Sequence, residues 1–358
     1  MKFLAKSLLA LIVLGVGAYF GKIQYDNYKD KLTVSKFIEV AAKSNKEQVS
    51  ETTSQATTTE ITTKSKEAKE KVMKEETAVM SSYGLYYDYA NLSLQDVVKE
   101  FMKEHGIQEG QIAISYKDLT TGELISYNET QPMRAGSTYK LPLSMLIKDK
   151  VDAGELSMDE RYDITKSSFE LASEHAAYVG QFGGAMKISD MWEYALVYSE
   201  NTPAHKMIEL MGGWENAYAQ YSKFGTSSST EVPTFSLDMN NQMKSNKTTT
   251  DYYIKVLEHL YNNTDKYSEI TKYLEAAFPD MYYRKYLPNL RILHKPGFSR
   301  EAMNASVVVY EKKPYVAAVY TRYLGGMDEN TILQSGEAEY QFAKLAYVIN
   351  QWHRVNKN

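Results

Sequence analysis

The chain has 358 residues, 43% of them hydrophobic and 24% charged, which is enough for one large domain or two small ones with a sizeable core. The formal net charge of −4 gives no support to a general role in binding nucleic acid or another polyanion. The absence of cysteine excludes disulfide bonds, thiolate metal sites and a cysteine nucleophile, but it leaves open whether the protein is exported.

The first 21 residues have the pattern of an export signal. Lys2 and Lys6 flank the start of an apolar run over residues 7–20, and a basic flank before an apolar run is typical of such signals. The run is shorter than the roughly 20 residues of a comfortable membrane span. Residues 16–18, Val-Gly-Ala, offer a weak cleavage site. We predict an uncleaved signal anchor over 1–21; a cleaved signal peptide and a buried helix are the alternatives.

The composition of residues 22–82 differs from that of the rest of the chain. Large apolar side chains are few between residues 42 and 77, where Ser, Thr, Lys and Glu dominate. Such a segment buries too little apolar surface to offset the entropy of ordering its backbone. We therefore predict a stalk that is disordered or only partly helical. It would hold a folded domain, residues 83–358, away from the membrane.

Within that domain, hydrophobic periodicity predicts strands at both ends and helices in the middle. Ser93 can cap a helix over 94–105. Apolar and polar residues alternate in two pairs of segments, which predicts strands, and a long helical middle and a last helix complete the pattern. The expected strands are 111–118, 123–128, 305–311 and 315–323, and the expected helical regions are 138–286 and 332–352. This order predicts an α+β fold, with one antiparallel sheet built from both ends of the domain, flanking terminal helices and an inserted all-helical subdomain.

The stretch MRAGSTYKLPL places Ser137 three residues before Lys140, at the start of an apolar helical pattern. Residues three apart lie on the same face of a helix. A serine hydroxyl needs an adjacent base to act as a nucleophile, and a lysine can be that base when burial lowers its pKa. Alone, such a pair is more often a capping serine beside a lysine whose amine reaches solvent.

Two further motifs follow in the chain. Ser199 and Asn201 form a Ser-x-Asn motif after an apolar helical pattern, and Lys295 and Gly297 form a Lys-x-Gly motif before a predicted strand. Each motif is weak alone, since other Ser-x-Asn and Lys-x-Gly triplets occur in the chain. The order Ser-x-x-Lys, Ser-x-Asn, Lys-x-Gly resembles that of the penicillin-recognising serine hydrolases, and most closely that of the class A β-lactamases.

The resemblance runs from about residue 94 to the C-terminus and implies the β-lactamase/transpeptidase-like fold. It also implies roles for the motif residues. Ser137 would be acylated, Lys140 would take its proton, and Ser199 would pass a proton to the leaving group. Asn201, Lys295 and Gly297 would contact the substrate. The backbone N–H groups of Ser137 and Phe298 would form the oxyanion hole. No metal and no cofactor is implied.

The sequence departs from the family pattern at several positions. Glu200 replaces the usual Asp of the second motif, and Pro296 replaces the usual Thr or Ser of the third. The glutamate that activates water in the family's Ω-loop has no counterpart, because neither Glu231 nor Asp238 has the expected spacing. His205 stands where the family carries an Asn that steadies this glutamate.

The motifs favour an extracytoplasmic serine acyl-enzyme hydrolase. The missing glutamate predicts slow turnover of β-lactams and favours D-alanyl amide or ester bonds of the cell wall as the natural substrate. A true β-lactamase and an inactive membrane-anchored cell-wall scaffold are the alternatives. The expected partners are the substrate and the membrane, not nucleic acid.

Overall fold

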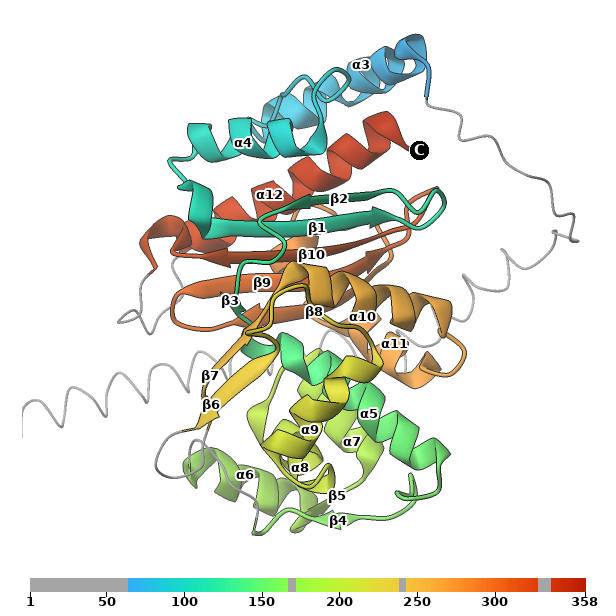
Figure 1. The fold of residues 1–358 in the computed structure, drawn as a ribbon, viewed down its shortest axis with the longest axis vertical. Helices are drawn as coiled ribbons and strands as arrows, with labels where there is room; N and C mark the ends of the chain where they lie inside the picture. Colours follow the sequence, from blue (N-terminus) through green and yellow to red (C-terminus); the bar gives the residue numbers. More distant parts are fainter. Residues whose placement is uncertain (1–63, 167–171, 238–242, 328–335) are drawn as a thin grey trace, which may run out of the picture. The chain divides into compact units, whose positions relative to one another are not determined.

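A five-stranded antiparallel sheet organises the structure of the protein (Figure 1). This computed structural model describes residues 64–166, 172–237, 243–327 and 336–358. The predicted signal anchor lies outside the described residues. Within the described ranges, no helix is both long and apolar enough to cross a membrane.

The sheet joins the two ends of the folded unit. Its strands in spatial order are β2 (Leu124–Tyr127), β1 (Ile112–Asp118), β10 (Tyr315–Arg322), β9 (Ala302–Val309) and β8 (Ile292–Phe298). The N-terminal hairpin meets the C-terminal strands where β1 pairs with β10, for example at Ile114 and Val319. The α+β fold with a sheet drawn from both ends of the domain, as predicted, is confirmed.

Alternating side chains of the sheet enter two separate cores. In β10, Tyr315, Ala317 and Val319 face the core shared with the terminal helices, whereas Val316 and Ala318 face the core shared with the helical block. This alternation follows from the two-residue period of a strand. Since both faces are covered, the central strands are buried along almost their whole length.

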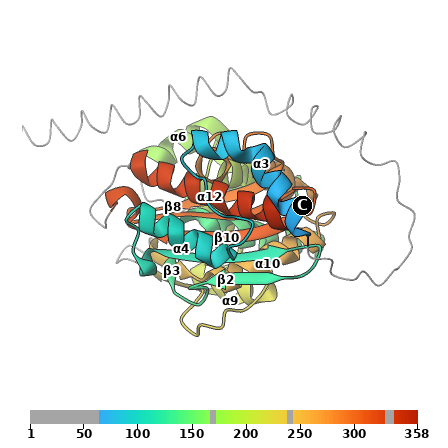
Figure 2. The same cartoon turned by 90° about the horizontal axis from the view of Figure 1, so that it is seen from above.

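Helices α4 (Leu94–Glu104) and α12 (Gly336–Asn356) cover the first face, and α3 (Lys66–Ser82) packs on α12; Figure 2 shows the three helices from above. Ser93 caps α4 as predicted, its hydroxyl accepting the Asp96 N–H at 3.1 Å. Helix α3 corrects the end of the predicted stalk, because residues 66–82 pack on α12 with Met73 and Met80 buried. Residues 22–63 of the predicted stalk lie outside the described residues. These two methionines are seven residues apart, so they share one face of an otherwise charged helix.

The second face carries α10 (Thr250–Asn262) and α11 (Ser268–Ala276), and the helical block lies beyond them (Figure 1). The helical block consists of α5 (Lys140–Asp152), α6 (Ala172–Phe182), α7 (Ile188–Trp192), η3 (Glu193–Val197), α8 (Asn201–Leu210), α9 (Trp214–Gln220) and η4 (Tyr221–Lys223).

Strands within residues 138–286 correct the expected all-helical insertion. Strands β6 (Thr234–Leu237) and β7 (Met243–Thr248) form a small sheet with β3 (Met133–Arg134), and β4 (Tyr162–Asp163) pairs with β5 (Ala185–Met186). Backbone pairing with β3, which precedes Ser137, favours an extended conformation for a segment with little helical periodicity.

His353 makes the stability of the first core depend on pH. Its side chain is fully buried, with Nδ1 2.7 Å from Tyr116 Oη, and burial lowers the pKa of His353 to about 4. Unfolded His353 binds a proton below about pH 6.5, whereas the folded form does so only near pH 4. Stability is therefore full above pH 6.5 and falls as pH drops toward 4, by about 3 kcal/mol for this group.

Urea unfolding at several pH values tests this prediction. The His353→Gln variant should be less stable than wild type at pH 7 but lose less of its stability between about pH 6.5 and 4. His175→Gln, at a partly exposed position in α6, is the control and should keep the wild-type pH dependence. Equal pH slopes for wild type and His353→Gln would contradict the prediction.

Candidate active site

The first motif lies in a short turn between β3 and α5, here called the Ser137 turn (residues 135–139). Residues Gly136–Tyr139 form one 3₁₀ turn, and Lys140 is the first residue of α5. Gly136 has φ +55°, in the left-handed region that a side chain disfavours. A Cβ built on Gly136 would lie 2.9 Å from Phe298 N, so the turn packs directly against the end of β8.

Neighbouring elements hold the Ser137 turn from several sides. Asn304 of β9 donates to the Arg134 carbonyl at 2.7 Å and to the Ala135 carbonyl at 3.3 Å. The hydroxyl of Tyr320, from β10, donates to Thr138 Oγ1 at 2.7 Å. The turn is therefore fixed by the sheet before any substrate arrives, as a preorganised site requires.

Lys140 is completely buried and points toward the second motif. Its Nζ donates to the Ser199 carbonyl at 2.5 Å and to Asn201 Oδ1 at 2.9 Å. The first and second motifs, predicted separately from the sequence, are therefore in direct contact. The lysine is not a surface side chain that reaches solvent.

Ser199 lies between a π-helical segment, η3, and the first residue of α8, Asn201. Its φ of +61° is unusual for a residue with a side chain, and such conformations cluster at functional sites. Lys295 donates from Nζ to Ser199 Oγ at 2.9 Å. The third motif thus contacts the second, and the contacts of Ser199 with Lys140 and with Lys295 link all three motifs.

Lys295 is fully buried in β8. Burial and, second, the charge of nearby Lys140 lower the pKa of Lys295 well below its usual value. Pro296, the departure from the usual third motif, is tolerated because β8 is the last strand of the sheet and pairs only with β9. Its carbonyl accepts a hydrogen bond from Lys295 Nζ at 3.2 Å.

Gly297 allows β8 to approach the Ser137 turn closely. A Cβ on Gly297 would overlap the Ala135 carbonyl oxygen and lie 2.8 Å from Thr138 Cγ2. Only a residue without a side chain brings the following residue, Phe298, beside the turn. The backbone of Phe298 therefore lies where the second donor of an oxyanion hole is expected.

We predict that Gly297→Ala both destabilises the protein and slows any reaction at Ser137. The new methyl group must push β8 away from the turn, and overpacking of this kind typically costs about 1–3 kcal/mol. Gly180→Ala in α6 is the control, since a Cβ there meets no atom within 4 Å. Melting temperatures of the two variants and wild type test the prediction, which fails if Gly297→Ala melts like Gly180→Ala.

Comparison with known proteins agrees with this geometry. The family model described as "Beta-lactamase enzyme family" matches residues 93–351, well over half of the chain. The chain belongs to the beta-lactamase enzyme family. It is a serine hydrolase of the beta-lactamase type, so the predicted family is confirmed.

Solved structures of class A beta-lactamases share the fold. The last common ancestor of Gram-negative bacteria beta-lactamase class A is 21% identical, covering 72% of this chain and 98% of that chain, with a TM-score of 0.57. A beta-lactamase from Burkholderia vietnamiensis is 20% identical, covering 73% and 97%, also with a TM-score of 0.57. No curated protein matches the chain.

The beta-lactamase-like site differs from the family pattern on the side of the Ω-loop. The segment from 226 to 249 contains the β6–β7 hairpin, and Glu231 is the only acidic residue in its described part. Glu231 is exposed, and Asp238 lies outside the described residues. His205, where an Asn was expected, is buried with its ring 5.6 Å from that of Trp214.

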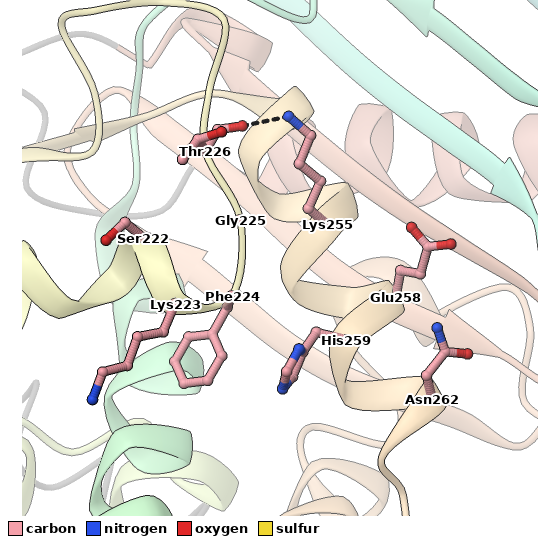
Figure 3. Close-up of a pocket in the computed structure, with 9 residues that line it drawn as sticks. All are labelled: Ser222, Lys223, Phe224, Gly225, Thr226, Lys255, Glu258, His259 and Asn262. Atoms are coloured by element: carbon pink, nitrogen blue, oxygen red, sulfur yellow. Dashed lines mark hydrogen bonds between the residues drawn. The ribbon is translucent and has the colours of Figure 1, made fainter.

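Other parts of the described structure do not add to this site. Within the described residues, no group of three or more His, Asp or Glu side chains could hold a metal ion. The pocket in Figure 3 lies between residues 222–226 and α10, and none of the predicted site residues lines it. Two of its charged side chains are engaged, Lys255 with the Thr226 carbonyl and Glu258 with Lys117.

Residues outside the motifs that hold the Ser137 turn were missed by the sequence analysis. Tyr320 lies in a predicted strand, and Asn304 lies one residue before the predicted start of another, residue 305. No local pattern distinguishes their polar groups from those of ordinary strand positions. A third such residue, Asn246, lies in β7, where no strand was predicted. Only the tertiary contacts of these residues reveal their part in the site.

Proposed function

We propose that the protein is an extracytoplasmic acyl-enzyme hydrolase that acts on D-alanyl amide or ester bonds of the cell wall and is acylated by β-lactams. The convergence of the three motifs on the Ser137 turn carries this proposal. It places a buried lysine, a serine hydroxyl and a second buried lysine together, with Gly297 and Phe298 packed against the turn.

The proposed reaction begins with attack by Ser137 Oγ on the substrate carbonyl carbon. Lys140 takes the hydroxyl proton, and the backbone N–H groups of Ser137 and Phe298 bind the developing oxyanion. The carbon–nitrogen or carbon–oxygen bond to the leaving group then breaks. Ser199, which lies between the two lysines, passes a proton to the leaving atom.

The two buried lysines, Lys140 and Lys295, favour a substrate that carries a carboxylate group. Lys295 is buried and its pKa is lowered by burial and by Lys140, so a bound carboxylate would favour its protonated form. Asn201 would hold the substrate amide beside Lys140. A D-alanyl peptide and a penicillin both offer a carboxylate and an amide to such a site.

The second half of the reaction needs a water molecule to attack the Ser137 ester. In the segment 226–249, Glu231 is the acid that the structure describes, and its side chain is exposed. This observation supports slow hydrolysis of a penicilloyl ester and a natural substrate other than a β-lactam. The predicted N-terminal anchor supports a location on the outer face of the cell membrane.

Intact-mass spectrometry of the full chain mixed with benzylpenicillin tests the proposal, with the remaining drug measured in parallel. A stable adduct of one drug molecule is the expected result. Rapid consumption of the drug without an adduct would identify a true β-lactamase instead. If neither the drug nor a D-alanyl peptide or ester reacts, the protein is an inactive scaffold and the proposal is wrong.

A further inference from the structure

One amide side chain from outside the three motifs holds both backbone groups of Gly136, the residue before Ser137. Asn246 Oδ1 accepts the Gly136 N–H at 3.1 Å, and Asn246 Nδ2 donates to the Gly136 carbonyl at 2.8 Å. The Asn246 carbonyl also accepts the Ala135 N–H at 3.0 Å. We propose that Asn246 is a positioning residue that orients the Ser137 N–H toward the developing oxyanion.

The geometry of the peptide bond carries this inference. The Gly136 carbonyl and the Ser137 N–H belong to one planar peptide group, in which C=O and N–H point in opposite directions. An amide that fixes the carbonyl from one side therefore fixes the direction of the N–H on the other. Because the N–H and C=O of one peptide polarise together, donation to the carbonyl also strengthens the N–H as a donor.

The surroundings of Gly136 make such support necessary. With φ +55°, its backbone is in the left-handed region, which glycine adopts readily but does not favour over other conformations. Asn246 is 4% exposed, so water competes little for its amide group. Phe298 N, the other expected donor, lies on the side of Gly136 where a Cβ would project. Asn246 and β8 thus hold the same turn.

This inference gives the β6–β7 hairpin a function. By the sequence resemblance, the hairpin corresponds to the part of the family that includes the Ω-loop. Through Asn246 it contacts the backbone of the Ser137 turn. Asn246 binds the peptide group beside the nucleophile rather than the substrate. Its removal should therefore lower the rate of acylation at saturating substrate and leave the affinity for unreacted substrate unchanged.

The Asn246→Asp variant tests the inference, which rests on the proposed function. An ionised aspartate still accepts the Gly136 N–H but repels the Gly136 carbonyl, whereas a protonated aspartate can donate to it. Relative to wild type at the same pH, we expect acylation by benzylpenicillin to be about 10- to 100-fold slower near pH 8. This difference should shrink as the pH falls toward about 5, because the site is buried and burial raises the pKa of a carboxyl group.

Two controls separate this effect from a loss of folding. Asn246→Ala should be slow at every pH, because it cannot donate to Gly136 at all. Asn216→Asp, at an exposed position in α9, should follow the wild-type pH profile. Melting temperatures at each pH show whether the variants are folded. Recovery of the rate at low pH is not expected from a residue that only stabilises the fold.

The outcomes distinguish the two proposals. A fluorophosphonate, which reacts with activated serines without needing a carboxylate, is tested beside benzylpenicillin. If wild type reacts with neither compound, the proposed acyl-enzyme function is wrong and the inference about Asn246 falls with it. If wild type reacts but Asn246→Asp reacts at the wild-type rate throughout the pH range, only the inference about Asn246 is wrong.

Discussion

The Ser137→Ala variant is expected to form no covalent adduct with benzylpenicillin or with a D-alanyl ester. Alanine keeps the backbone N–H of the Ser137 turn and the hydrogen bonds of Lys140 to Ser199 and Asn201, but it removes the oxygen that forms the ester bond. For serine enzymes, loss of the nucleophile lowers the rate by a factor on the order of 10⁶. Because Ser137 is only partly buried, the fold should be unaffected.

Intact-mass spectrometry and melting curves of wild type and Ser137→Ala test this prediction. Ser268→Ala, at the exposed first position of α11, is the matched control and should be acylated like wild type. Noncovalent binding of the drug to Ser137→Ala, measured by calorimetry, should persist because Lys295 and Asn201 are intact. An adduct on Ser137→Ala would place the nucleophile elsewhere.

The second large effect is expected for Lys140→Met. Methionine has nearly the length of lysine and fills the same buried space, but it cannot accept the Ser137 proton. Acylation should slow by a factor on the order of 10² to 10⁴, the usual contribution of a general base. The variant takes a donor from the Ser199 carbonyl and from Asn201 Oδ1, which costs about 1–3 kcal/mol. It should remain folded, because domains are typically stable by about 5–15 kcal/mol.

A time course of adduct formation at saturating benzylpenicillin measures this effect. Lys150→Met, in the last turn of the same helix, removes an amine that pairs with Glu155 near the surface and serves as the control. We expect its rate to equal that of wild type. If Lys140→Met is acylated at the wild-type rate, another group takes the proton and the proposed role of Lys140 is wrong.

Local sequence patterns predicted the elements whose residues carry a strong period. The sequence predicted the cap at Ser93, the β1–β2 hairpin and the strands β9 and β10. Each of them has a local signature: a capping residue, a turn between two strands, or alternating apolar residues. The start expected for the last helix, residue 332, lies outside the described residues. The motif order also predicted the family, now confirmed by the comparison.

Features that depend on a distant partner could not be predicted in this way. Strand β7 has the sequence MKSNKT, in which apolar and polar residues do not alternate. Its extended conformation depends on backbone pairing with β3. Helix α3 is highly charged, and its two buried methionines gain a core only from α12. The contact between Asn246 and Gly136 spans 110 residues and has no local signature.

The pairing of β1 with β10 has a consequence for the way the chain folds. The two strands are separated by about 200 residues, so β1 pairs only with β2 until almost the whole chain has been made and β10 is available. Closing so long a loop is slow, and folding rates fall as contacts become less local. We expect the helical block to form first and the sheet to close last, which leaves the N-terminal hairpin exposed during synthesis. Since Lys295 and Phe298 belong to that sheet, the enzyme should acquire its active site only in the final step of folding.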